Sequence, residues 1–175
     1  SHVVKLQLYR AKSLVNPIYS SDRYKHFQKF ELTKDQYQYL SKQIVDSGKE
    51  FMASIWDVEM LDWVDEYIQR YKIGSGDLTA YKLIKEFCLR GKPIIISTGL
   101  SSLEQVKNLV QYIYSLNSDY KNFGMLTILQ CTSMYPIPHS DANLNVMHTL
   151  RDNFNHPYGY SDHTRGTEAL ELATV

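Results

Sequence analysis

The chain has 175 residues, with 19 basic and 19 acidic side chains and a formal net charge of +0 at pH 7. This balance excludes the cationic excess of nucleic-acid-binding proteins, and no apolar run approaches the roughly 20 residues that cross a bilayer. With 43% hydrophobic residues the chain can bury a core, and its 2 cysteines are too few for a disulfide framework. We therefore expect a globular protein of a reducing cytoplasm, with no nucleic-acid or membrane partner.

Short apolar runs alternate with longer amphipathic runs along the whole chain, which is typical of repeated strand–helix units. The expected strands are, in chain order, residues 3–9, 51–55, 71–75, 93–97, 126–130 and 157–161. Two helices begin with capping-box spacings, Thr33 with Gln36 and Ser101 with Glu104. The stretch 10–32 shows no helix or strand pattern and is expected to be a long loop that covers another part of the protein.

Every expected strand ends in polar side chains. In chain order these include Lys5 and Gln7, Ser54, Ser75, Ser97, Gln130, and Asp162 with His163. The carboxyl ends of parallel strands converge on one face, and in (β/α)8 barrels that face holds the active site. A polar residue at one strand end only marks the start of a loop, but six strands that agree predict a site at this face.

Two lysines lie within expected strands, where side chains are usually apolar. Lys5 shares a strand face with Gln7, and Lys72 precedes the small residue Ser75. A lysine in the middle of a parallel strand needs an anionic partner or a ligand. An ion pair or an exposed ammonium explains either lysine alone. Two lysines near Ser75 and Ser97 together favour a phosphate cradle, because ammonium and N–H groups can then surround the oxyanion.

His163 is the only histidine at the end of an expected strand. A lone histidine in such a place is either a hydrogen-bonded structural residue or a ligand. Gln130 ends the preceding strand and could supply an oxygen, but one imidazole and one amide are an incomplete metal coordination set. Substrate or water would have to complete it.

Four motifs in register resemble the sialic acid synthases, the N-acetylneuraminate synthase family. They are Lys72-Ile73-Gly74-Ser75-Gly76-Asp77, Lys92-Pro93-Ile94-Ile95-Ile96-Ser97-Thr98-Gly99, Gln130-Cys131-Thr132-Ser133 with Tyr135-Pro136, and Gly159-Tyr160-Ser161-Asp162-His163. Val4-Lys5-Leu6-Gln7 is similar to the family's second-strand motif, which normally has Phe at the position of Leu6. Ser54 stands where the family commonly has Thr.

The resemblance implies an α/β fold, an incomplete TIM (β/α)8 barrel in which residues 1–175 form one partial catalytic domain with approximately strands two to seven. The family's first and eighth strands and its C-terminal antifreeze-like domain would lie outside this chain. We therefore expect the segment alone to be inactive, because open sheet edges and missing groups leave the barrel unfinished. The full-length form is expected to be a homodimer.

The resemblance also implies a reaction. Phosphoenolpyruvate condenses with N-acetylmannosamine or a related N-acetylated hexosamine, water adds, and phosphate leaves by C–O cleavage, with Mn²⁺ or Mg²⁺ as cofactor. The implied phosphoenolpyruvate contacts are Lys5, Ser54, Lys72, Ser75 and Ser97. The implied sugar contacts are Gln7, Asp162 and Tyr135. His163 and Gln130 would flank the metal, and these two with Lys72 are the implied catalytic residues.

Three alternatives stay open. A paralogue that makes legionaminic or pseudaminic acid would share the phosphoenolpyruvate half of the site. A Schiff-base aldolase would use Lys5 or Lys72 as its nucleophile. An inactive barrel segment would have only a binding role.

Overall fold

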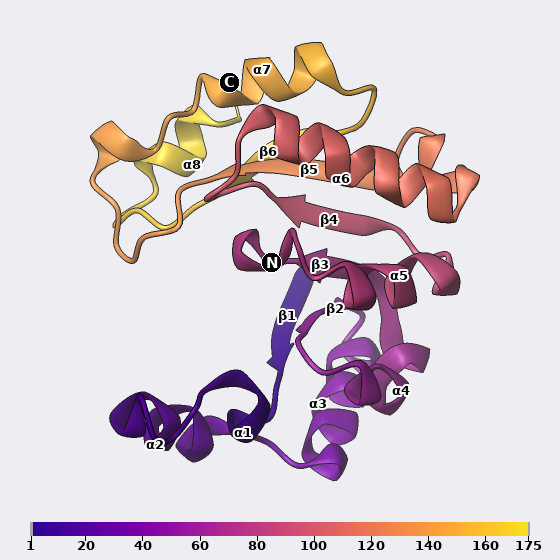
Figure 1. The fold of residues 1–175 in the computed structure, drawn as a ribbon, viewed down its shortest axis with the longest axis vertical. Coiled ribbons are helices and arrows are strands. Elements are labelled where there is room, and N and C mark those ends of the chain that lie inside the picture. Colours follow the sequence, from indigo (N-terminus) through magenta and orange to yellow (C-terminus); the bar gives the residue numbers. More distant parts are fainter. Residues whose placement is uncertain (1, 175) are drawn as a thin grey trace. The chain divides into compact units, whose positions relative to one another are not determined.

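The structure is a computed structural model that describes residues 2–174. Strands and helices alternate along the chain, as the sequence predicts (Figure 1). The strands are β1 (Val3–Leu8), β2 (Glu50–Ile55), β3 (Ile68–Ile73), β4 (Ile94–Ser97), β5 (Leu126–Cys131) and β6 (Tyr158–Ser161). The α-helices are α1 (Ala11–Leu14), α2 (Ser21–Phe30), α3 (Lys34–Asp46), α4 (Leu61–Val64), α5 (Tyr81–Arg90), α6 (Leu103–Leu116), α7 (Val146–Asn153) and α8 (Glu168–Leu172).

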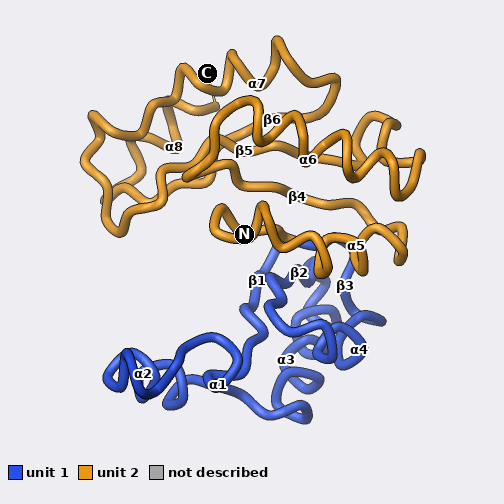
Figure 2. Tube along the Cα trace, in the orientation of Figure 1, with its two compact units in different colours: residues 1–71 blue, residues 72–175 orange. Residues whose placement is uncertain are grey.

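The chain divides into two compact units, residues 1–71 and residues 72–175 (Figure 2). In the first unit β1 pairs with β2, and β2 with β3. In the second unit β4 pairs with β5, and β5 with β6. All of these pairs are parallel, which confirms the predicted α/β class. No helix within residues 2–174 is both long and apolar enough to span a bilayer.

In the first unit, α3 packs against β2. The predicted capping box of α3 is confirmed: the Gln36 backbone N–H donates to Thr33 Oγ1 at 3.3 Å, and the Thr33 N–H donates to Gln36 Oε1 at 2.8 Å. Each bond satisfies an N–H group that the helix leaves without a partner. The Tyr37 ring is buried in this unit, and its hydroxyl donates to the Gln7 carbonyl at 2.9 Å. Helix α3 therefore fixes the end of β1 that carries Gln7.

In the second unit, alternation along the strands separates two faces of the sheet. We call apolar face the one that carries Ile94, Ile96, Leu126, Ile128 and, at its end, Gln130; the register pairs Ile94 with Leu126 and Ile96 with Ile128. We call site face the opposite one, which carries Ser97, Leu129, Cys131, Gly159 and Ser161; the register pairs Ser97 with Leu129 and Cys131 with Ser161. The four aliphatic residues of the apolar face are almost fully buried.

Two local predictions were wrong. The stretch 10–32 is not a structureless loop, because it contains α1 and α2. Helix α2 has no buried residue, although Tyr24, Phe27 and Phe30 recur at the three-residue spacing of a helix face. Helix α6 is capped by Ser102, whose hydroxyl accepts the Gln105 N–H at 3.3 Å, one residue later than predicted.

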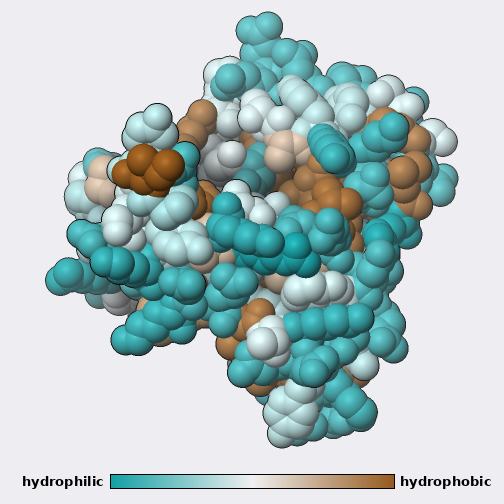
Figure 3. Space-filling view, turned by 60° about the horizontal axis from the view of Figure 1, so that its bottom comes forward, coloured by the Kyte–Doolittle hydropathy of each residue, from teal (hydrophilic) through white to brown (hydrophobic). Residues whose placement is uncertain are grey.

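The surface carries few extended apolar areas on the face shown in Figure 3, where hydrophilic side chains cover most of the area and hydrophobic ones lie in separate patches. Scattered apolar side chains of this kind are normal for a folded protein surface.

Candidate active site

Lys72 and Ser97 meet at the ends of β3 and β4. The Lys72 side chain is 9% exposed, and its Nζ donates to Ser97 Oγ at 2.5 Å and to the Ile73 carbonyl at 2.8 Å. Ser97 is itself 2% exposed. A buried ammonium beside a serine hydroxyl can hold an anionic oxygen through charge-assisted hydrogen bonds. The structure thus brings together two residues that the sequence assigns to phosphate binding.

Gly99 packs the loop after β4 against two other loops. Its N–H donates to Ser75 Oγ at 3.0 Å. A Cβ atom at this position would lie 2.5 Å from Ser133 Oγ, 2.9 Å from the Cys131 carbonyl oxygen and 2.9 Å from Ser75 Oγ. Only glycine allows so close an approach. This contact holds the predicted phosphate ligand Ser75 beside the end of β4.

Three predicted site residues belong to the first unit and share one face of its sheet. The register places Gln7 directly opposite Ser54, and Lys5 lies two residues before Gln7 on the same side of β1. Lys5 keeps part of its side chain in solvent, yet partial burial lowers its pKa from the ordinary lysine value. The predicted pairing of Lys5 and Gln7 on one strand face is confirmed.

His163 follows β6 and lies against the end of β5. Its Nδ1 is 2.8 Å from the Thr132 carbonyl oxygen, and its Nε2 is 3.9 Å from Cys131 Sγ. A carbonyl oxygen can only accept, so in neutral His163 the proton is on Nδ1 and the Nε2 lone pair faces the Cys131 thiol. Metal-binding histidines are commonly held in this way. His163 therefore fits a metal ligand on its own geometry.

Gln130 points to the other side of the sheet. It precedes Cys131 in β5 and so lies on the apolar face, where its Nε2 donates to the Ala142 carbonyl at 3.1 Å. Thr132 reaches the same segment, because its hydroxyl donates to the Asp141 carbonyl at 2.7 Å. Gln130 thus holds the segment before α7 and does not face His163. Within residues 2–174 no group of three His, Cys, Asp or Glu side chains could hold a metal ion.

Asp162 and Tyr135, the predicted sugar contacts of this unit, are both near His163: Asp162 precedes it in the chain and Tyr135 contacts its ring. Asp162 accepts the Thr164 N–H at 2.8 Å and the Thr164 hydroxyl at 3.1 Å. Burial alone would raise the pKa of Asp162. The hydrogen bonds from Thr164 and Tyr160 lower it by more than burial raises it, so the pKa lies below its ordinary value. The Tyr135 ring is stacked on His163 with centroids 3.8 Å apart.

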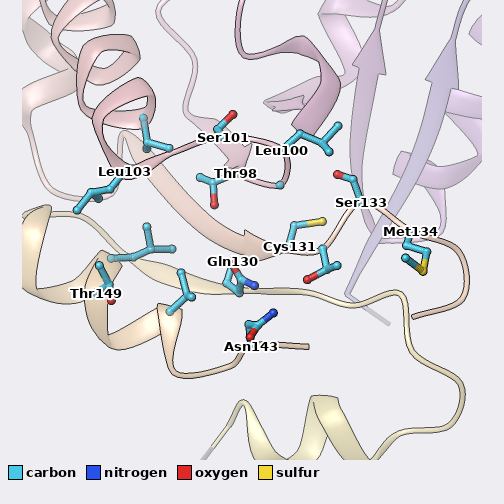
Figure 4. Close-up of a pocket in the computed structure, with 15 residues that line it drawn as sticks. Thr98, Leu100, Ser101, Leu103, Gln130, Cys131, Ser133, Met134, Asn143 and Thr149 are labelled. Carbon is cyan, nitrogen blue, oxygen red and sulfur yellow. The ribbon is translucent and has the colours of Figure 1, made fainter. Parts of the chain in front are cut away.

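A pocket of about 440 Å³ in the second unit lies beside the end of β5. Figure 4 shows its lining, which includes Thr98, Leu103, Gln130, Asn143 and Thr149. No acidic or basic side chain lines it. The sequence did not predict this pocket, since it depends on how α6 and α7 pack beside the strands.

The sequence also missed the role of Cys131 and Gly99. Cys131 is 5% exposed and meets His163 through a register that no local motif specifies. Gly99 ends the second of the four motifs, and a glycine two residues after a strand end was the available signal for a close approach of backbones.

Several known proteins are similar to this chain. The model of the NeuB family matches residues 1–175. The N,N'-diacetyllegionaminic acid synthase of Legionella pneumophila is 34% identical over 97% of this chain and 51% of its own length. The human N-acetylneuraminate-9-phosphate synthase is 32% identical over 86% of this chain and 40% of its own. Other relatives are named pseudaminic acid synthase.

Among solved structures, the N-acetylneuraminic acid (sialic acid) synthetase of Leptospira borgpetersenii, determined in complex with citrate, superposes with a TM-score of 0.89 at 25% identity. The match covers 99% of this chain and 58% of that one. This chain spans about half the length of the curated relatives it matches. The family model covers the whole chain, so the chain belongs to the NeuB family.

Proposed function

We propose that the protein condenses phosphoenolpyruvate with an N-acetylated hexosamine and water, giving a nonulosonic acid and phosphate. Family membership supports the general activity, the synthesis of sialic-type acids. The chain matches about half of each relative, and the activity is proposed for the whole protein. A closed (β/α)8 barrel, a homodimer and a cytoplasmic location belong to the same proposal.

The contact between Lys72 Nζ and Ser97 Oγ carries the proposal. It places a buried cation and a hydroxyl at adjoining strand ends. The Ser75 hydroxyl lies beside the same strand ends, because it accepts a hydrogen bond from the Gly99 N–H in the loop after β4. Phosphoenolpyruvate carries a phosphate and a carboxylate, so it needs several donors of this kind. We assign the anion to Lys72, Ser75 and Ser97. Lys5 and Ser54, which share a face of the first unit, are assigned to the same ligand.

The proposed reaction balances without any redox partner. Carbon 3 of phosphoenolpyruvate forms a bond to the aldehyde carbon of the open-chain sugar, and the aldehyde oxygen takes up a proton. Water adds to carbon 2 and gives up both of its protons, one in exchange for the proton taken up by the aldehyde oxygen and one to the departing phosphate, as carbon 2 becomes a carbonyl and its bond to the bridging oxygen breaks. The role of the lysines and serines is to hold the departing phosphate and neutralise its charge.

We assign His163 as a ligand of a divalent cation, Mn²⁺ or Mg²⁺, through Nε2, because the Thr132 carbonyl holds the proton on Nδ1 and a cation would replace the long contact of Nε2 with the Cys131 thiol. Bound there, the cation would supply Lewis-acid polarisation of the aldehyde and a more acidic water. Gln130 faces away from His163, so we assign it instead as a positioning residue for the segment before α7. We assign the sugar to Gln7, Asp162 and Tyr135.

The sugar substrate is tested by measuring phosphate release from phosphoenolpyruvate with a panel of aldehyde sugars. The panel contains three sugars. N-acetylmannosamine would give N-acetylneuraminate, its phosphate ester would give N-acetylneuraminate 9-phosphate, and a diacetamido hexose would give a diacetyllegionaminic acid. We expect release only when phosphoenolpyruvate, Mn²⁺ and one of these sugars are all present. Absence of release from the full-length protein with every sugar would contradict the proposal.

A Schiff-base aldolase remains the second candidate, because the lowered pKa of Lys5 leaves more of its nucleophilic amine at neutral pH. Such an enzyme would form an imine between Lys5 and the carbonyl of pyruvate. Borohydride reduction would make that bond permanent. A covalent pyruvate adduct on Lys5 would favour this candidate, whereas an unmodified Lys5 favours the synthase.

A further inference from the structure

A small pocket of the first unit lies where β1 and β2 end, and no step of the proposed reaction uses it. Its volume is about 160 Å³. A water molecule takes up about 30 Å³ in the liquid, so the pocket has room for a substituent such as an acetamido or a phosphate group. Its lining comes from the two segments that follow these strands: Tyr9, Arg10, Ser13, Leu14, Trp56 and Asp57.

The pocket lies close to a predicted sugar contact of the same unit. Gln7 is the last residue but one of β1, and Tyr9 and Arg10 follow shortly after it. The Trp56 N–H donates to the Leu8 carbonyl at 3.0 Å, which keeps the segment after β2 beside the segment after β1. Substrates of parallel α/β folds bind at this edge of the sheet. The pocket is therefore placed to receive one substituent of a sugar bound at Gln7.

The apolar wall of the pocket suits a methyl group. Tyr9, Leu14 and Trp56 form this wall, and the Tyr9 and Trp56 ring centroids are 6.0 Å apart. The Tyr9 side chain is fixed, because it is buried and its hydroxyl donates to the Phe27 carbonyl at 3.2 Å. Among the substituents that distinguish the three candidate sugars, only a second acetamido group carries a methyl that would gain from such a wall.

The polar groups of the pocket complement an amide. The Arg10 guanidinium and the Ser13 hydroxyl can donate to its oxygen, and the Asp57 carboxylate can accept from its N–H. Asp57 Oδ1 already accepts the Glu59 N–H at 3.1 Å, but a carboxylate has about four acceptor positions, so capacity remains. Donor, acceptor and apolar wall thus occur together around a space of the right size.

The charges around Arg10 oppose a phosphate group in the same place. Arg10 Nη1 lies 3.0 Å from Glu59 Oε2 and 3.6 Å from Asp57 Oδ2. Among the described residues that line the pocket, Arg10 is the single cation, and these two carboxylates already outnumber it. A phosphate dianion would therefore meet the Asp57 carboxylate without a cation of its own, whereas a neutral acetamido group meets no such repulsion.

We propose that this pocket, which we call the acetamido pocket, binds a second acetamido group of the sugar. The enzyme then prefers a diacetamido hexose to N-acetylmannosamine and to its phosphate ester. This inference rests on the proposed function and chooses among the three sugars that the function leaves open. No bond is made or broken in the pocket, so its residues set the choice of substrate and leave the reaction itself unchanged.

The test is kcat/KM for phosphate release by the full-length protein with each of the three sugars, at saturating phosphoenolpyruvate and Mn²⁺. We expect the diacetamido hexose to exceed both other sugars at least about tenfold, the effect of one charge-assisted hydrogen bond. Asp57→Asn keeps an oxygen for the Glu59 N–H but removes the charge. It should lower the value for the diacetamido hexose at least about tenfold, raise that for the phosphate ester and leave that for N-acetylmannosamine nearly unchanged.

A second variant and a matched control make the result independent of one side chain. Arg10→Met keeps an apolar stem but removes every donor, so it should lower the value for the diacetamido hexose without raising that for the phosphate ester. The control is Asp46→Asn, which removes an exposed carboxylate of α3 in the same unit, where Lys42 Nζ donates to it at 2.7 Å. It should leave all three values unchanged. Thermal unfolding checks that each variant is folded.

A preference for the phosphate ester or for N-acetylmannosamine would overturn the acetamido pocket while the synthase reaction stands. So would a preference for the diacetamido hexose that both folded pocket variants keep. Absence of release with every sugar would instead contradict the proposed function. Calorimetric titration of the three sugars then decides on the pocket alone: tighter binding of the diacetamido hexose that Asp57→Asn weakens supports it, and equal or absent binding overturns it.

Discussion

Replacing Lys72 by alanine is expected to weaken phosphoenolpyruvate binding by roughly 10- to 140-fold, because it removes a charge-assisted hydrogen bond of about 1.5–3 kcal/mol. Lys72 is buried against Ser97 at the junction of two strand ends, where an anion would lose its cationic partner. Calorimetric titration of the full-length protein measures the effect. The melting temperature should change little by comparison.

The matched control is Lys85→Ala, which removes an exposed lysine of α5 in the same unit. Its phosphoenolpyruvate affinity should equal that of the unmodified protein. If Lys72→Ala also keeps full affinity while remaining folded, the assignment of the anion to the end of β3 is wrong. In that case Lys72 serves only the packing of β3 and β4.

The second large effect is expected for His163→Ala. The cation-dependent phosphate release should fall at least about 100-fold, the upper range for disturbing the surroundings of a metal ligand, whereas phosphoenolpyruvate should still bind. The two functions separate because the lysines and serines assigned to the anion lie on other strands. Phosphate release with and without Mn²⁺, together with the binding titration, measures both.

An exposed histidine of α7, His148, provides the control. His148→Ala should retain both binding and turnover. Full Mn²⁺-stimulated turnover in His163→Ala would show that the imidazole only holds the Thr132 carbonyl and the Tyr135 ring in place. That outcome would leave the anion site unaffected.

The succession of strands and helices and the α/β class could be predicted because apolar runs and amphipathic runs alternate so regularly. Boundaries were less accurate. The third strand begins at Ile68, three residues before the predicted start, since Gln69 and Arg70 interrupt the apolar run that marked it. The start of α6 is ambiguous in the sequence, because Ser101 and Ser102 each stand three residues before a residue that can complete a capping box.

The site was predicted only in part, for a reason that lies in strand geometry. In β5 both faces are largely apolar, so periodicity cannot say which face Gln130 takes. Register with β6 decides it, placing Cys131 beside His163 and turning Gln130 toward Ala142. The proximity of Lys72 and Ser97 was predictable, because parallel strands bring a lysine and a serine at neighbouring strand ends to the same edge of a sheet.

The central claim is that phosphate leaves phosphoenolpyruvate by cleavage of its C–O bond when the sugar condenses. Phosphoenolpyruvate with a heavy-oxygen label in the bridging position tests this most directly, with the released phosphate analysed by mass spectrometry. The account predicts that all of the bridging label appears in the phosphate, and that release requires the sugar. Label retained in the organic product would show cleavage of the P–O bond and would contradict the proposed synthase reaction.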